Sequence, residues 1–201
     1  MLAAIIMSAE ERHEYFMRLA PYFKASLGIF GIGLIVGLIM VARFPDLAEH
    51  FQASLAGFVQ IFHGMPKLQL AAAIFFNNAI KTVAAMIFGC LFALVPVFLL
   101  FANGAALGLV FSLSTQTRGL WISLLSIVPH GMLELPAVFF GTSIGLMLGT
   151  HAIKSLYRKN ETTLGAEMVR SLKFFCTVIA PLLLVAAFVE AFLTAELVSP
   201  K

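Results

Sequence analysis

The sequence predicts an all-helical protein that crosses a membrane about five times. Hydrophobic residues make up 61% of the 201 residues and charged residues only 11%, compared with about 25% charged residues in soluble domains. The mean hydropathy is +0.99, and the apolar residues lie in long runs between short charged segments. A chain of this length has room for one helical bundle, so residues 1–201 are expected to form a single transmembrane domain.

Five apolar runs are the candidate spans: residues 22–42, 71–101, 104–114, 119–150 and 174–193. A helix needs about 20 residues to cross the hydrocarbon core of a bilayer, so the third run is short and the fourth is too long for one straight span. Pro129 and Pro136 lie inside the fourth run, and proline removes a helical hydrogen bond. We therefore expect a broken or re-entrant helix near residues 104–136.

Residues 46–66, between the first two runs, have a different pattern. Leu47, Phe51 and Leu55 recur at helical spacing, whereas Glu49 falls on another face. This pattern predicts an amphipathic interfacial helix that lies along the membrane surface or against the bundle.

The distribution of basic residues predicts the orientation of the chain. Residues 150–173 are rich in basic side chains: Lys154, Arg158, Lys159, Arg170 and Lys173. Basic loops tend to face the cytoplasm, and Arg12, Arg18 and Lys24 place the N-terminus on the same side. One further crossing follows this loop, so we expect a multi-pass protein of the cell membrane with a cytoplasmic N-terminus and the C-terminus outside.

The pair formed by His130 and Glu134 is the first candidate site. No other ionisable side chain occurs between residues 119 and 150. A carboxylate at the centre of a bilayer costs roughly 2.5–3.5 kcal/mol on insertion scales, so Glu134 needs a partner or a polar cavity. Ionisable residues inside a membrane are functional candidates by default.

Three roles are open to this pair. If a helix begins at Pro129, His130 and Glu134 lie one turn apart on one face, where they can bind a divalent metal such as Zn²⁺. They can equally relay a proton, because histidine titrates near neutral pH. The third role is structural, a hydrogen bond that fastens two helices. A tetrahedral metal site would need further ligands, for which there are three candidates: Asn77, Asn78 and Glu190.

Lys81 completes the set of candidate site residues. It follows the Asn77-Asn78 pair by one helical turn. We expect its ammonium either to pair with Glu134 or Glu190, or to extend toward the membrane surface.

Two sets of glycines are spaced for close packing between helices. They are Gly33 and Gly37 in the first run, and Gly141, Gly145 and Gly149 in the fourth. A small bundle is expected to use only one of these faces internally, so the other face predicts a homodimer.

Four features together resemble the stage II sporulation protein M family. They are Asn77-Asn78, Asn103-Gly104 with Leu107-Gly108, Pro129-His130-Gly131 with Glu134 and the glycines after it, and Glu190-Ala191-Phe192-Leu193-Thr194. The resemblance covers residues 71–194 and implies an all-helical integral membrane protein. In spore formers the namesake is tied to a membrane complex that remodels peptidoglycan during engulfment. The polar positions that the resemblance maps onto this chain are Asn78, His130, Glu134 and Glu190.

These observations predict a protein that binds or translocates an ion or small polar solute through an intramembrane polar site, alone or as a subunit of a larger complex. One alternative is a scaffold that recruits cell-envelope enzymes. A second is an intramembrane metal-dependent hydrolase, although a non-enzymatic role is preferred. The expected partners are the lipid bilayer, a second copy of the chain and other membrane or envelope proteins. The basic residues flank apolar spans, so no nucleic acid is expected, and a divalent metal is the one cofactor considered.

Overall fold

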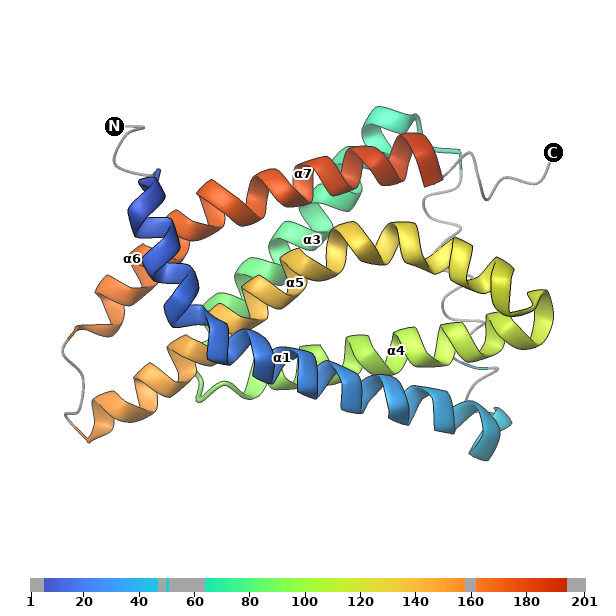
Figure 1. Cartoon of the computed structure of the whole chain (residues 1–201), viewed down its shortest axis with the longest axis horizontal. Coiled ribbons are helices and arrows are strands. Elements are labelled where there is room, and N and C mark those ends of the chain that lie inside the picture. The colour runs from blue at the N-terminus through green and yellow to red at the C-terminus, as the bar shows by residue number, and fades with distance from the viewer. Residues whose placement is uncertain (1–5, 47–49, 51–63, 158–161, 195–201) are drawn as a thin grey trace.

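The computed structural model describes residues 6–46, 50, 64–157 and 162–194, without the side chains of residues 126–133 and 193–194. Every ordered element in these ranges is a helix (Figure 1). The elements are α1 (Ala9–Arg43), α3 (Lys67–Gly89), α4 (Leu94–Arg118), α5 (Leu120–Leu156), α6 (Leu164–Phe174), the π-helical turn η2 (Phe175–Ile179), α7 (Ala180–Val189) and the π-helical turn η3 (Glu190–Thr194).

Five helical segments are long and apolar enough to cross a membrane. They are Ala9–Arg43, Lys67–Gly89, Leu94–Arg118, Glu134–Leu156 and Leu164–Phe192. The predicted helical bundle with five spans is confirmed. Most of the predicted interfacial helix at 46–66 lies outside the described residues.

The helices alternate in direction along the bundle. The start of α1, the end of α5 and the start of α6 lie at one end, here called the N-terminal end (Figure 1). Gly119 and η3 lie at the opposite end, here called the Gly119 end. This arrangement is what five successive crossings require.

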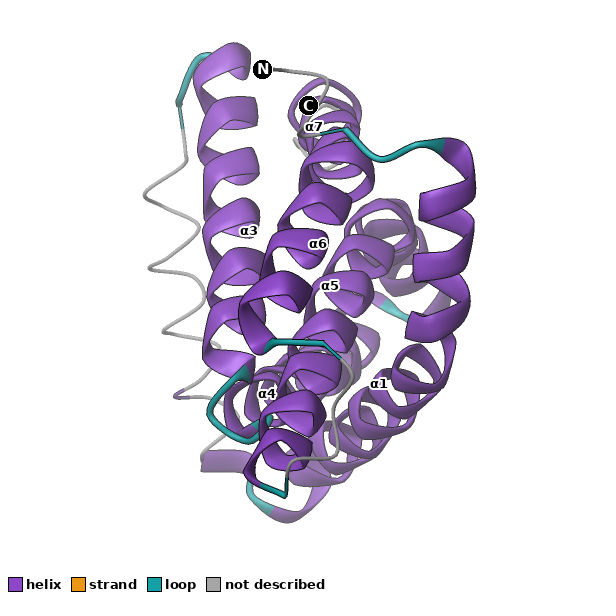
Figure 2. Ribbon diagram, turned by 90° about the vertical axis from the view of Figure 1, so that its left-hand side faces the viewer, coloured by secondary structure: helices purple, strands orange, loops and turns teal. Residues whose placement is uncertain are grey.

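α5 is the central helix of the bundle. It packs against α1, α3, α4, α6 and α7, and Figure 2 shows it lying among its neighbours when the bundle is viewed from the N-terminal end. Residues 141–149 of α5 are all buried. The fold therefore places Thr142 and Ser143 of α5 in the interior of the protein.

The glycines of α5 allow close contact with α3. A β-carbon added at Gly141 would overlap the methyl group of Thr82, and one added at Gly145 would overlap the carbonyl oxygen of Ala85. These contacts are as tight as those of small-residue faces in other membrane helices. These two glycines, about one turn apart on α5, therefore bring α3 and α5 into close contact.

The glycines of α1 are also used inside the chain. β-Carbons at Gly33 and Gly37 would overlap the carbonyl oxygens of Phe101 and Ala105 on α4, and Gly104 and Gly108 face α1 in the same way. Both sets of predicted packing glycines thus lie in contacts within one chain. Neither set is left as a free surface, so these glycines do not support the predicted homodimer, which stays a prediction.

The boundaries of the middle spans differ from the prediction. The apolar run 71–101 is divided by a turn at residues 90–93, where Phe92 and Ala93 have φ of 54° and 63°. Residues 104–114 are consequently the second half of α4. The turn consists of apolar residues, so hydropathy could not separate the two helices.

The chain reverses within the predicted range 104–136, but at Gly119 and not at the prolines. Gly119 has φ of 82°, whereas α5 continues through Pro129 and Pro136. Helical hydrogen bonds are strongly favoured in lipid because no water is present to replace them. α5 is curved in its yellow portion (Figure 1), and prolines inside a helix are a common cause of such bends.

Candidate functional site

The candidate site lies halfway along α3. Asn78 is eleven residues from both Lys67 and Gly89, the two ends of this helix. At 1.5 Å per residue, Asn78 is therefore about 16 Å from either end. A span of this length places the side chain near the middle of the membrane layer.

Glu134 of α5 meets Asn78 at this depth. The amide Nδ2 of Asn78 donates a hydrogen bond of 2.5 Å to Oε1 of Glu134, and both side chains are half-buried. The two helices run in the same direction (Figure 1), and Glu134 lies fourteen residues after Leu120, the first residue of α5. A carboxylate predicted to need a partner thus has a hydrogen-bond donor on the neighbouring helix.

Glu190 lies closer to the Gly119 end than this pair. It is the first residue of η3, which packs against both α3 and α5. The Nζ atom of Lys67 lies 5.7 Å from the centre of the Phe192 ring, which places η3 beside the start of α3. One carboxylate oxygen of Glu190 is buried. The two carboxylates therefore stand at different depths along the same pair of helices.

The remaining predicted residues are placed as follows. Asn77 is half-buried, next to Asn78. Lys81 is exposed and forms no ion pair with Glu134 or Glu190, both of which are described. The side chain of His130 lies outside the described residues. Within the described part of the chain, no three His, Cys, Asp or Glu residues are grouped so that they could hold a metal ion.

A second polar cluster, centred on Glu167 of α6, was not foreseen. The Glu167 side chain is only 2% exposed, and its Oε1 lies 3.0 Å from the Arg18 guanidinium and 3.8 Å from that of Arg170. Its Oε1 also accepts a hydrogen bond from the Thr162 hydroxyl at 3.2 Å. The sequence predicts a basic loop at residues 150–173, whereas α5 extends to Leu156 and α6 begins at Leu164. The helical spacing of the buried residues Glu167, Ser171 and Phe174 was the available signal.

Beyond this cluster, hydrogen bonds between hydroxyl groups join α1 to α5 and α6. Tyr15 and Ser171 share a hydrogen bond of 2.8 Å, and Tyr22 and Thr150 share one of the same length. Farther along α1, the buried hydroxyl oxygens of Ser26 and Ser143 lie 3.0 Å apart. These bonds position α1 against α5 and α6 in the half of the bundle next to the N-terminal end.

The fold and its buried polar pairs define a polytopic α-helical membrane protein. The chain belongs to the stage II sporulation protein M family, whose model matches residues 26–195. It is also similar to an uncharacterized protein of Methanocaldococcus jannaschii, with 24% identity over 174 residues that cover 86% of this chain and 93% of the relative. No solved structure matches the chain.

The family match confirms the resemblance predicted from the sequence and extends it. The matched range includes Asn78, Glu134 and Glu190, and it begins inside α1, ahead of the predicted residue 71. The first turns of α1, including Arg18, lie before the matched range. The Arg18–Glu167 contact therefore joins a residue outside the family match to one inside it.

Proposed function

We propose that this membrane protein binds an ion or small polar solute at the centre formed by Asn78 and Glu134, and carries it across the membrane. It does so alone or as one subunit of a larger complex. The observation that supports this function is a carboxylate at mid-depth that accepts a hydrogen bond from the adjacent helix. Binding sites of many transporters lie near the bilayer midplane between such helices.

The energetics favour a role beyond helix attachment. A carboxylate at this depth costs roughly 2.5–3.5 kcal/mol, whereas hydrogen bonds between membrane helices average only about 0.6 kcal/mol. Glycine packing already brings α3 and α5 into close contact at Gly141 and Gly145. A carboxylate is therefore an expensive addition to an interface that is already in close contact.

The chemistry of the two side chains favours a cation. Asn78 uses its Nδ2 to donate to Glu134, which leaves its carbonyl oxygen on the same side chain as an acceptor. Carboxylate and amide oxygens are the ligands that hard cations prefer, and a carboxylate can also take up a proton. Intramembrane carboxylates mark ion and proton pathways in pumps and transporters. We therefore infer that the solute is a proton or a small cation.

The proposal is tested by flux measurements on purified protein in liposomes. A pH-sensitive dye inside the vesicles reports proton movement, and isotope or fluorescent-indicator uptake reports small cations. Glu134→Gln keeps the shape of the side chain and removes its charge, so we expect flux to fall to the level of empty vesicles. Glu10→Gln makes the same change at an exposed position of α1 and is expected to keep wild-type flux.

Other outcomes separate this proposal from its rivals. Flux that persists in Glu134→Gln contradicts the proposal. A wild-type protein without flux that co-purifies with cell-envelope enzymes supports the scaffold role instead. A stoichiometric metal, measured by elemental analysis and lost in Glu134→Gln, supports the hydrolase alternative.

A further inference from the structure

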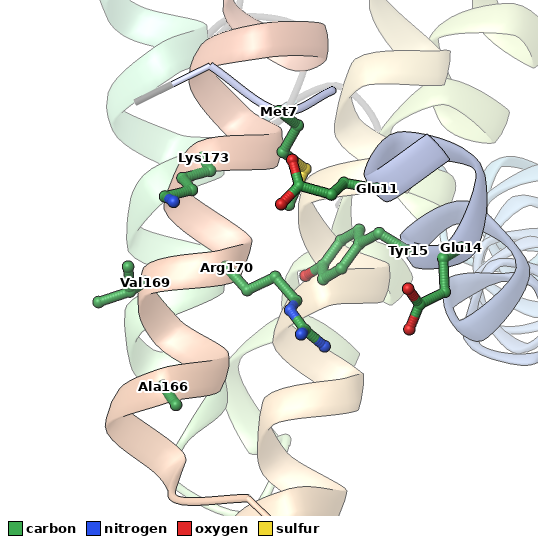
Figure 3. A pocket seen from close by; sticks show the side chains of 8 residues that line it. All are labelled: Met7, Glu11, Glu14, Tyr15, Ala166, Val169, Arg170 and Lys173. Carbon is green, nitrogen blue, oxygen red and sulfur yellow. The ribbon is translucent and has the colours of Figure 1, made fainter. Parts of the chain in front are cut away.

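A small pocket opens between the first turns of α1 and α6 (Figure 3). Its volume is about 210 Å³, and eight residues line it: Met7, Glu11, Glu14, Tyr15, Ala166, Val169, Arg170 and Lys173. Pockets that hold drug-sized ligands usually measure roughly 300–1,000 Å³. The pocket is therefore of a size for a small polar group.

The two walls of this pocket carry opposite charges. Arg170 and Lys173 extend from α6 and Glu11 and Glu14 from α1, with Tyr15 between them (Figure 3). On each helix the two residues are three positions apart and so share a face. The pocket therefore offers a cationic wall and an anionic wall to one ligand.

Two of these charges form no hydrogen bond or close ion pair within the described part of the chain. The side chains of Glu14 and Lys173 make no hydrogen bond and no ion pair within 4 Å with any described residue. The Lys173 ammonium does attract the Glu11 carboxylate electrostatically, without a close contact. Glu11 already accepts a hydrogen bond of 2.7 Å from the Ser8 backbone at the start of α1. Arg170 is only loosely associated with Glu167, at 3.8 Å. A ligand with both a positive and a negative group would satisfy Glu14 and Lys173 together.

The position of the pocket relates it to the membrane surface. Charged residues on α6 end at Lys173, directly before the apolar segment that begins at Phe174, and those at the start of α1 end at Lys24. Large apolar side chains beside the pocket are exposed, with Val169 at 57% and Leu172 at 50%. These features place the pocket where lipid head groups meet acyl chains.

We propose that this pocket binds the phosphoethanolamine head group of a membrane lipid. Arg170 and Lys173 donate charge-assisted hydrogen bonds to the phosphate. The carboxylate of Glu14 accepts hydrogen bonds from the ammonium. The acyl chains lie over Val169 and Leu172. This site is separate from Asn78 and Glu134 and does not depend on the function proposed for them.

The charge balance distinguishes this lipid from others. An anionic lipid would bring its negative head group toward Glu11 and Glu14. A choline head group carries no N–H donor for the Glu14 carboxylate. A phosphoethanolamine group has both a phosphate and a hydrogen-bonding ammonium, so it matches both walls.

The test is lipid binding to the delipidated full-length protein, followed by native mass spectrometry in detergent. Phosphatidylethanolamine, phosphatidylcholine and phosphatidylglycerol with identical acyl chains are titrated in turn. We expect phosphatidylethanolamine to bind about tenfold more tightly than the other two, the effect of about one charge-assisted hydrogen bond. Glu14→Gln and Lys173→Gln should each remove this preference, and Lys173→Arg should keep it.

Matched controls use the same substitutions outside the pocket. Glu10 lies on α1, as Glu14 does, and Lys154 lies at the N-terminal end of the bundle, as Lys173 does. Glu10→Gln and Lys154→Gln should both keep the preference for phosphatidylethanolamine. Equal binding of the three lipids by the wild type overturns the proposal, as does preference for the glycerol lipid. Retained preference in Glu14→Gln overturns it too. Soluble phosphoethanolamine that binds as tightly as the lipid would show a site for a solute and would also overturn it.

Discussion

Arg18 of α1 and Glu167 of α6 form an ion pair with an N–O distance of 3.0 Å, although they lie 149 positions apart in the sequence. The Glu167 side chain is buried, while that of Arg18 is 38% exposed. The pair lies at the N-terminal end, close to the Tyr15–Ser171 hydrogen bond. It ties the start of the first span to the start of the last one.

Removing the charge of Arg18 should destabilise the protein more than removing that of Arg170. Loss of one partner from a fully buried pair costs about 3–5 kcal/mol. Because Arg18 is partly exposed, we expect Arg18→Met to lower the free energy of unfolding by roughly 2–3 kcal/mol. Arg170→Met, at 3.8 Å from the carboxylate, should cost under about 1 kcal/mol. Unfolding in SDS measures both, and equal effects would contradict this assignment.

Alanine substitutions at two glycines should have opposite effects. At Gly145 the new β-carbon overlaps the backbone carbonyl of Ala85, whereas at Gly28 it meets no atom within 4 Å. Gly145→Ala should therefore lower stability by about 1–3 kcal/mol, the usual cost of overpacking. Gly28→Ala should raise it by up to about 1 kcal/mol through helix propensity. Thermal unfolding in detergent checks the signs, and a stabilised Gly145→Ala would refute the close α3–α5 contact.

The hydrogen bond of Asn78 should be visible in a double-mutant cycle. Asn78→Ala removes the donor to Glu134, so we expect a loss of about 1 kcal/mol, somewhat above the average of about 0.6 kcal/mol for hydrogen bonds between membrane helices because the acceptor is charged. Asn77→Ala is the neighbouring control and should cost less than about 0.5 kcal/mol, because Asn77 makes no hydrogen bond with any described residue. In a Glu134→Gln background the cost of Asn78→Ala should shrink. An unchanged cost there would show that the two side chains act independently.

Glu134→Gln alone should leave the melting temperature unchanged or raise it. The substitution removes a desolvated charge and keeps an acceptor for Asn78. If the pair only fastened two helices, loss of the charged hydrogen bond would lower the melting temperature. Differential scanning fluorimetry on the same preparations used for flux decides between these outcomes.

Cysteine labelling tests the orientation of the bundle. Lys154 and Arg118 lie at opposite ends of the structure, near the ends of α5 and α4. In a protein with both native cysteines replaced by alanine, we expect Lys154→Cys to react only from the cytoplasmic side and Arg118→Cys only from outside. The native Cys90 would itself react slowly with the label, because burial raises the pKa of its thiol and the thiolate is the reactive form. Reversed labelling would invert the predicted topology.

Much of the fold could be predicted because hydropathy reports where a chain crosses a membrane. The number of spans followed from five apolar runs, and Glu134 was conspicuous because its run contains only one other ionisable side chain. The depth of each polar side chain in the membrane, and the neighbouring helix that it faces, could not be predicted. Asn77 and Asn78 point about 100° apart on a helix, and only the packing of α3 on α5 selects Asn78 as the donor.

Two other features could not be predicted because the residues around them show no distinctive sequence pattern. The turn at residues 90–93 is apolar, so it resembles the helices on both sides. Glu167 lies among basic residues that a solvated loop would also contain. Its burial depends on Arg18, which comes from the other end of the chain, and a pattern confined to one segment cannot report such a partner.

The interlocked glycines of α1 and α4 also constrain the order in which the chain assembles during synthesis. Gly108 follows Gly37 by 71 residues, so α1 enters the bilayer long before its partner exists. At translation rates of about 5–20 residues per second, the wait is roughly 4–14 s. During this time the small-residue face of α1 meets only lipid or the insertion machinery. The nascent first span is therefore a stage at which a foreign helix with a matching face could capture the chain before its own α4 arrives.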